Sequence, residues 1–186
     1  MNKKTVIIMS VLIAAVVIII ALVLFVGNRQ SAKLSPRKST EFSYNGLDIS
    51  VSYGQPSKRG RLIFGPEKDG ALQPFGKYWR LGANEATEIT FSKDVLFEGN
   101  PLKAGTYRMY AVPGDSVWQV GLNSELGAWG AGEPDYDRDV LKVNVRGTDA
   151  PDVTEQFIID FKHDSTSVWM VFNWDQARVP VRIGTH

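Results

Sequence analysis

Six side chains that could bind a ligand lie in one glycine- and proline-rich segment, from Gly54 to Ala86. Three of them are arginines, whose planar guanidinium groups donate paired hydrogen bonds to anionic groups. A tryptophan can stack on a ligand, and an asparagine and a glutamate can fix its orientation. The six residues are Arg59, Arg61, Trp79, Arg80, Asn84 and Glu85. Together they predict a polar pocket for a small anionic or glycan ligand.

A structural interpretation of the same residues stays open. Arg80 can form an ion pair with Glu85 or Glu88. Asn84 can cap a turn, and Trp79 can close the hydrophobic core, since a buried tryptophan covers a large apolar area. Which of these side chains converge does not follow from their positions in the chain.

An enzymatic interpretation is the alternative to a binding module. A carboxylate-based glycan hydrolase would use Glu85 or Glu88 with a second carboxylate such as Asp175, about 5–10 Å away across a cleft. The run His163-Asp164-Ser165 contains the residue types of a catalytic triad, but adjacent residues cannot fold back into one. We therefore expect a non-enzymatic binding or accessory module, and no catalytic residue is assigned. Its expected partner is a protein, a glycan or a small anion, bound through the Gly54–Ala86 segment.

No metal or cofactor site is predicted. Asp135, Asp137 and Asp139 alternate as in a calcium loop, but Val140 stands where that loop needs glycine. Arg146 stands where it needs a bidentate glutamate, so an exposed acidic turn is the simpler interpretation. The chain has no cysteine, which excludes disulfides, thiol nucleophiles and thiolate zinc sites.

The aromatic residues allow two interpretations. They can form a platform on which sugars stack, or they can fill the core and the edges of a sandwich, which is the commoner use of large aromatic side chains. The residues are Trp118, Trp129, Trp169, Trp174, Tyr107 and Tyr110.

Charge is distributed unevenly along the chain. All 20 acidic residues lie at or after Glu41, and six of the 21 basic residues precede Ser39. The segment from Ser39 onward therefore has 15 basic and 20 acidic residues, a net charge of −5. Nucleic-acid binding requires a basic face, so a nucleic-acid partner is not expected.

The N-terminal segment predicts a transmembrane helix. Val6 to Val26 contains no charged residue and is long enough to cross a hydrocarbon core of about 30 Å. We expect residues 1–27 to be an anchor in the lipid bilayer, 28–39 to be a basic juxtamembrane linker and 40–186 to be a globular domain. A cleaved signal peptide is the main rival, but its apolar core is shorter and it ends in a small-residue cleavage site.

The sequence allows two interpretations of the side of the membrane on which the globular domain lies. Four basic residues follow the apolar segment and two precede it, which by the positive-inside rule would leave the domain in the cytoplasm. A short N-terminal tail with two lysines is instead typical of a signal-anchor, which exports the domain. A further alternative is a subunit of a membrane complex, in which the helix packs against partners.

The rest of the chain alternates with a period of two residues, as half-buried strands do. Leu47, Ile49, Val51 and Tyr53 alternate with polar residues, and Asn45-Gly46 before them predicts a hairpin turn. Nine or ten short strands separated by turns, without long helical periodicity, predict a mainly β fold: an antiparallel β-sandwich or barrel-like domain. The expected strands are 40–44, 47–53, 88–91, 95–97, 106–112, 117–122, 140–145, 156–161, 168–174 and 179–183.

Five ordered blocks of this sequence resemble the bacterial domain-of-unknown-function family DUF2911. They are Tyr53–Gly65 (YGQPSKRGRLIFG), Pro74–Phe91 (PFGKYWRLGANEATEITF), Leu102–Tyr107 (LKAGTY), Trp118–Asn123 (WQVGLN) and Leu126–Gly130 (LGAWG). The resemblance covers nearly everything from about Ser35 onward. It implies a bacterial envelope protein that enters the export pathway through an N-terminal hydrophobic segment, held in the inner membrane with a periplasmic domain. The family has no established activity, so the resemblance assigns no catalytic residue.

Overall fold

The computed structural model describes residues 2–185 as two compact units, divided between Leu34 and Ser35. The first unit is a single helix, α1 (Lys3–Leu34), which is long and apolar enough to cross a membrane. Helix-forming residues such as Gln30 and Ala32 carry α1 past Gly27. It ends before Pro36, which disfavours helical backbone in the residue that precedes it. Of the expected linker 28–39, only Ser35 and Pro36 lie outside α1 and the first strand.

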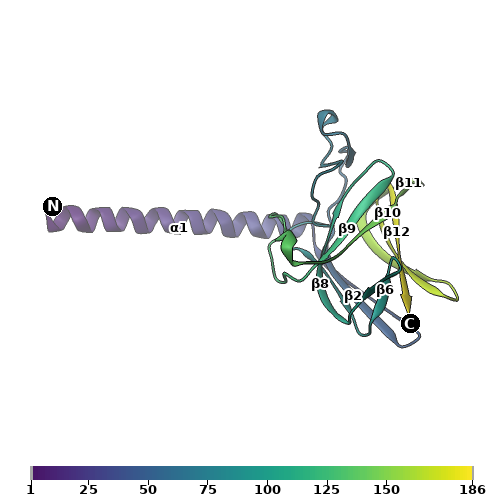
Figure 1. Cartoon of the computed structure of the whole chain (residues 1–186). Coiled ribbons are helices and arrows are strands. Elements are labelled where there is room, and N and C mark those ends of the chain that lie inside the picture. Colours follow the sequence, from purple (N-terminus) through teal and green to yellow (C-terminus); the bar gives the residue numbers. More distant parts are fainter. Residues whose placement is uncertain (1, 186) are drawn as a thin grey trace. The chain divides into compact units, whose positions relative to one another are not determined.

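The second unit is built from two antiparallel sheets, so the expected mainly β, sandwich-like architecture is confirmed (Figure 1). The six-stranded sheet has the order β1 (Arg37–Tyr44), β2 (Leu47–Gly54), β5 (Thr87–Phe91), β8 (Gly105–Val112), β9 (Val117–Asn123) and β10 (Asp139–Arg146). The four-stranded sheet has the order β11 (Thr148–His163), β12 (Ser167–Thr185), β6 (Val95–Phe97) and β7 (Asn100–Leu102). The two sheets do not join into a closed barrel within residues 2–185.

The hairpin between β1 and β2 has the predicted turn. Tyr44 pairs with Leu47, and Asn45 and Gly46 between them have φ angles of 50° and 72°. Two consecutive positive φ angles are the mark of the tight hairpin turn whose twist matches that of the flanking strands.

The hydrophobic core lies between the two sheets, where alternate residues of each strand point inward. Ile49 and Val51 of β2 are at most 1% exposed, and so are Phe157 and Ile159 of β11. β8 is unusual because both of its faces are buried, so that Arg108 is covered as well as Met109. Something must therefore cover the outer face of the six-stranded sheet at this strand.

β12 unites two of the expected strands, 168–174 and 179–183, and its inward face changes at Asp175 between them. Before Asp175 the core side chains of β12 are at even positions, such as Phe172 and Trp174; after it they are at odd positions, such as Val179 and Val181. Asp175 has a φ of 55°, and the pairing of β12 with β11 shifts register there. This bulge turns the inward face of the strand by one residue and re-aims the side chains beside it.

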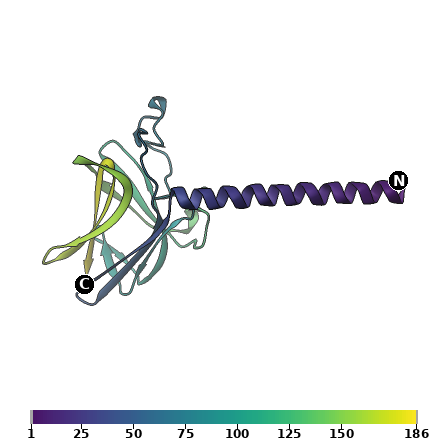
Figure 2. The same cartoon turned by 180° about the vertical axis from the view of Figure 1, so that it is seen from behind.

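Residues 55–86, here called the flap, connect β2 to β5 with little regular structure. They contain the parallel pair β3 (Phe64–Gly65) and β4 (Gln73–Pro74) and one turn of 3-10 helix, η1 (Glu67–Asp69). The blue-teal tip of the flap projects from the sheets in both views (Figures 1 and 2). A second turn of 3-10 helix, η2 (Tyr136–Arg138), ends the β9–β10 loop.

We expect Gly46→Ala to lower the free energy of unfolding by about 1–2 kcal/mol, because a Cβ is unfavourable in left-handed backbone. Urea unfolding of the detergent-solubilised chain measures this value. Gly132→Ala is the matched control, since no atom lies within 4 Å of its added Cβ and its φ is not positive. Equal stability of the two variants would contradict the assigned turn.

Candidate functional site

Trp79 fixes the flap to both sheets. Its backbone exchanges two hydrogen bonds with Ala111 of β8, at 2.7 and 2.8 Å. Its ring, 2% exposed, stacks on Trp174 of β12 with 5.7 Å between ring centroids. The flap therefore returns over one end of the sandwich at a defined position, instead of lying free in solvent.

Phe64 of β3 extends this aromatic cluster toward the surface. Its ring meets Trp118 of β9 edge-on at 4.7 Å and Trp174 at 5.9 Å between centroids. Edge-to-face packing adds about 0.5–1.5 kcal/mol per pair beyond the area that it buries. The cluster thus provides a rigid apolar wall beside the bulge of β12.

A pocket of about 430 Å³ lies against this wall. It forms where the flap, the β8–β9 turn, the β10–β11 junction and the bulge of β12 meet. Its apolar lining residues are Leu62, Phe64, Phe75, Trp118, Ala177 and Val179. Its polar lining side chains are Asp115, Ser116, Thr148, Asp149, Asp175 and Gln176. The volume is within the usual range of small-molecule sites.

The pocket is acidic. Of its three carboxylates, only Asp175 has a basic partner: Lys58 of the flap forms an ion pair with it, and both side chains are at most 20% exposed. Asp115 and Asp149 are exposed at the mouth, and within residues 2–185 no protein group pairs with either carboxylate. The bulge at Asp175 is the local feature that brings the third carboxylate to the pocket.

The structure separates the predicted arginines into two places. Arg61 donates to the backbone oxygens of Ser57 at 2.6 Å and Lys58 at 2.9 Å, and the backbone of Arg59 donates to Glu155. Arg80 lies where the flap enters β5, and donates to the backbone oxygen of Asn84 at 3.2 Å. No contact joins Arg80 to the other two arginines within the described residues.

The remaining predicted residues lie beside Arg80 or in the core. The amide of Asn84 donates to the backbone oxygen of Ser35 at 3.2 Å, and Glu85 lies 3.7 Å from the Arg37 guanidinium. Trp79 is part of the hydrophobic core, as the structural interpretation of the sequence allowed. None of the six residues is among those that line the acidic pocket, and ligand binding by them stays a prediction.

The carboxylates considered for hydrolysis also lie apart. Glu88 accepts a hydrogen bond from the backbone of Gly127 at 2.7 Å, on the outer face of the six-stranded sheet, whereas Asp175 lines the pocket. His163 stacks on Tyr44 with 4.2 Å between centroids. Within residues 2–185 no three His, Asp or Glu side chains are grouped to hold a metal ion.

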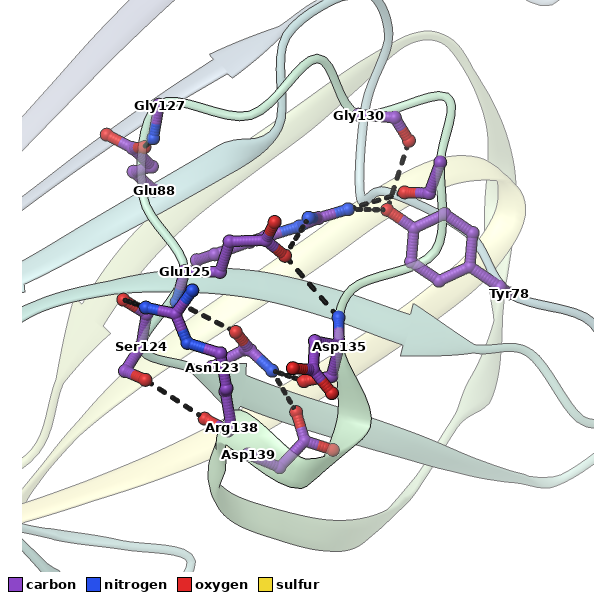
Figure 3. A network of polar contacts seen from close by, with 12 residues as sticks. Tyr78, Glu88, Asn123, Ser124, Glu125, Gly127, Gly130, Asp135, Arg138 and Asp139 are labelled. Atoms are coloured by element: carbon purple, nitrogen blue, oxygen red, sulfur yellow. Dashed lines mark hydrogen bonds and ion pairs between the residues drawn. The ribbon is translucent and has the colours of Figure 1, made fainter.

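The β9–β10 loop, residues 124–138, covers the outer face of β8 and is tied down by a buried arginine. Arg108, 2% exposed, donates to Glu125 at 2.9 Å, to the Tyr78 hydroxyl at 2.8 Å and to the backbone oxygen of Gly132 at 2.6 Å. The Tyr78 hydroxyl donates in turn to the backbone oxygen of Gly130 at 3.0 Å (Figure 3). A charged group can be buried here because three of its N–H groups are paired, one of them with a carboxylate.

A second group of polar residues holds the base of the same loop. The amide of Asn123 donates to the backbone oxygen of Asp135 and to the Asp139 carboxylate, at 2.8 and 2.7 Å (Figure 3). The Tyr110 hydroxyl also donates to Asp139, at 2.7 Å. Burial raises the pKa of Tyr110 far above its ordinary value, and this hydrogen bond raises it further. Asp139 is therefore occupied in holding the loop, which fits a structural use of the acidic turn.

Burial also lowers the pKa of Arg80, and the neighbouring Arg108 lowers it further while Tyr78 raises it.

Sequence reasoning did not find the Arg108 network, because an arginine at an outward position of a strand normally faces water. One residue of the sequence, Gly121, does indicate that this outer face is covered. It pairs with Tyr110 across β8 and β9. A Cβ at Gly121 would lie 2.2 Å from the Tyr110 ring, so glycine there marks a ring lying flat on the sheet.

Comparison with known proteins identifies one family. A family model described as a protein of unknown function (DUF2911) matches residues 35–183, which is the whole of the β unit apart from its last residues. No curated protein and no solved structure matches the chain.

We expect Arg108→Met to lower the free energy of unfolding by about 2–4 kcal/mol, because it leaves buried partners without their donor. The β9–β10 loop should also be cleaved faster by a protease. Denaturant unfolding and limited proteolysis measure the two effects. Arg146→Met, at an exposed position of β10, is the control and should change stability by no more than about 0.5 kcal/mol. Equal behaviour of the two variants would show that Arg108 does not hold the loop.

Proposed function

The chain belongs to the DUF2911 family, and we propose that this member is a membrane-anchored binding protein whose β-sandwich takes a small organic cation in its acidic pocket. The observation that carries the proposal is the set of three carboxylates, Asp115, Asp149 and Asp175, around an aromatic wall; within residues 2–185 their only basic partner is Lys58, which pairs with Asp175. The proposed function is binding, in line with the binding or accessory module expected from the sequence.

The sign of the ligand follows from the charges around the pocket. No basic side chain is among the residues that line it, and Lys58 neutralises one carboxylate of three. An anion entering the mouth would be repelled by Asp115 and Asp149, whereas an ammonium group would be attracted. The pocket thus favours a cation, while the anionic ligand expected from the sequence belongs with the arginines elsewhere on the flap.

The apolar lining determines the rest of the ligand's chemistry. Phe64 and Phe75 are half-buried and Leu62 is exposed, so each offers apolar surface to the pocket. An aromatic face attracts a cation by about 0.5–2 kcal/mol in addition to its apolar contact. A ligand with one or two amino groups on a short carbon skeleton would use both the carboxylates and this wall.

The anchor in the proposal is α1, through Val6–Val26. Its uninterrupted helix and its exposed apolar side chains suit a lipid environment. The domain is proposed to face the periplasm of a bacterium from the inner membrane. The support is the short N-terminal tail with two lysines, together with the export route that the family resemblance implies.

We expect putrescine and spermidine to bind the detergent-solubilised chain, and the uncharged analogue 1,4-butanediol not to bind, in isothermal titration calorimetry. Asp115→Asn and Asp149→Asn should each weaken amine binding by about 2- to 5-fold, since an exposed ion pair contributes up to about 1 kcal/mol. Asp160→Asn, at an exposed position of β11 outside the pocket, is the matched control and should bind like the parent chain. Binding of the diol as tightly as the diamine would refute a cation site.

We expect a reporter that is active only outside the cytoplasm, fused after His186, to be active in bacterial cells. Mass spectrometry of the membrane fraction should find the uncleaved 20.6 kDa chain. Activity of a cytoplasm-specific reporter at the same position would reverse the proposed orientation. Loss of the first 25–35 residues would instead identify the segment as a cleaved signal peptide.

A further inference from the structure

The tip of the β9–β10 loop exposes two large apolar side chains on a segment without charge. Leu126–Gly132 has the sequence LGAWGAG, and Leu126 and Trp129 are each 48% exposed. Within residues 2–185 the Trp129 ring has no aromatic neighbour, and its indole N–H has no hydrogen-bond acceptor. Such a side chain has an apolar body and a polar group that are both available to an outside partner.

The tip is bonded to the end of the flap. The backbone of Ala86 donates to the oxygen of Ala128 at 3.1 Å, and that of Gly130 donates to the oxygen of Asn84 at 3.0 Å. A backbone bridge between Glu85 and Trp129 lies between these two hydrogen bonds. The loop tip and residues 84–86 therefore run side by side as one short ribbon.

The same three flap residues are bonded to the start of the β unit. The Asn84 amide donates to the Ser35 oxygen at 3.2 Å, and the Arg37 guanidinium donates to the oxygen of Ala86 at 3.1 Å. Trp129 is thus separated from the first residues after Leu34 by a single intervening segment. Only Ser35 and Pro36 lie between the last residue of α1 and β1.

The length of α1 determines how far Ser35 lies from a bilayer that the helix spans. Eight residues, Gly27–Leu34, continue the helix beyond the apolar segment and rise by about 12 Å. Each headgroup layer of a bilayer is about 5–8 Å thick. Ser35 therefore lies just beyond the headgroups of an upright helix, and closer to them when the helix tilts.

We propose that the Leu126–Gly132 tip is a second membrane contact, through which Leu126 and Trp129 enter the headgroup layer near the point where the chain leaves the bilayer. The proposal rests on the membrane anchoring proposed above. Indole prefers this layer because its apolar body and its N–H group are both satisfied there. The tip brings no charge that would have to lose its hydration, and the hydrogen bonds from Arg108 and Tyr78 hold it in place before contact.

The absence of cysteine makes a site-specific test direct. Single cysteines in the full chain at Leu126, Ser165 and Ile18 would carry a nitroxide label in phosphatidylcholine nanodiscs. Ser165 is the matched control: it lies in the exposed β11–β12 turn, where the Tyr44 hydroxyl meets the Asp164 backbone at 3.0 Å. That turn is at the far end of β1, about 24 Å from Arg37.

Collision rates with oxygen and with a water-soluble nickel complex report the depth of each label. We expect the label at position 18 to be deep in the bilayer, the label at 165 to be aqueous and the label at 126 to be at headgroup depth. Trp129→Glu should return the label at 126 to the aqueous value without changing thermal unfolding of the chain, since the ring makes no core contact.

Three outcomes would overturn the proposal, and they differ from one another. If the label at 18 is deep and the label at 126 is as aqueous as that at 165, the anchor stands and the second contact fails. If the label at 18 is aqueous, anchoring itself fails. If the label at 126 is shielded from both collision reagents, a protein partner or a second copy of the chain covers the tip instead of lipid.

Discussion

The packing of Trp79 against Trp174 is the contact on which the rest of the β unit depends. It joins a backbone that is paired with β8 in one sheet to a ring of β12 in the other, so the two sheets and the flap meet at one point. Phe64 and Trp118 pack around this point and form the wall of the pocket. The pocket therefore has a fixed shape only while Trp79 holds the flap over the end of the sandwich.

On the outer face of the six-stranded sheet, polar groups hold a loop in place, as aromatic rings hold the flap in the core. Arg108 is buried under the β9–β10 loop, and its guanidinium holds two chain segments, the flap at Tyr78 and the loop at Glu125 and Gly132. Its Nε remains without a partner inside the fold, which is a cost of about 1–3 kcal/mol that the other hydrogen bonds must offset. Such networks specify one arrangement of a loop more strictly than apolar contacts, because any shift leaves several groups unpaired at once.

The strands were predictable from the sequence where a local pattern determines them, and the pocket was not. Alternation and the Asn45-Gly46 turn gave β1 and β2, since both depend on neighbouring residues alone. β7 was missed because two of its three residues, Asn100 and Pro101, are types that favour turns. The pocket carboxylates come from positions 115, 149 and 175, each unremarkable in its own segment, and the bulge that re-aims the third is a tertiary feature. The many glycines and prolines of the flap are typical of irregular structure, but the burial of Trp79 within it depends on β8 and β12.

The place of β12 within its sheet has a consequence for how the protein is made. β12 is an interior strand, paired with β11 on one side and through Ile183 with Phe97 of β6 on the other. The four-stranded sheet can therefore not be completed until β12 has been synthesised. In an emerging chain, α1 would leave the ribosome while the β unit is still open, with the edge of β6 unpaired and the core residues exposed.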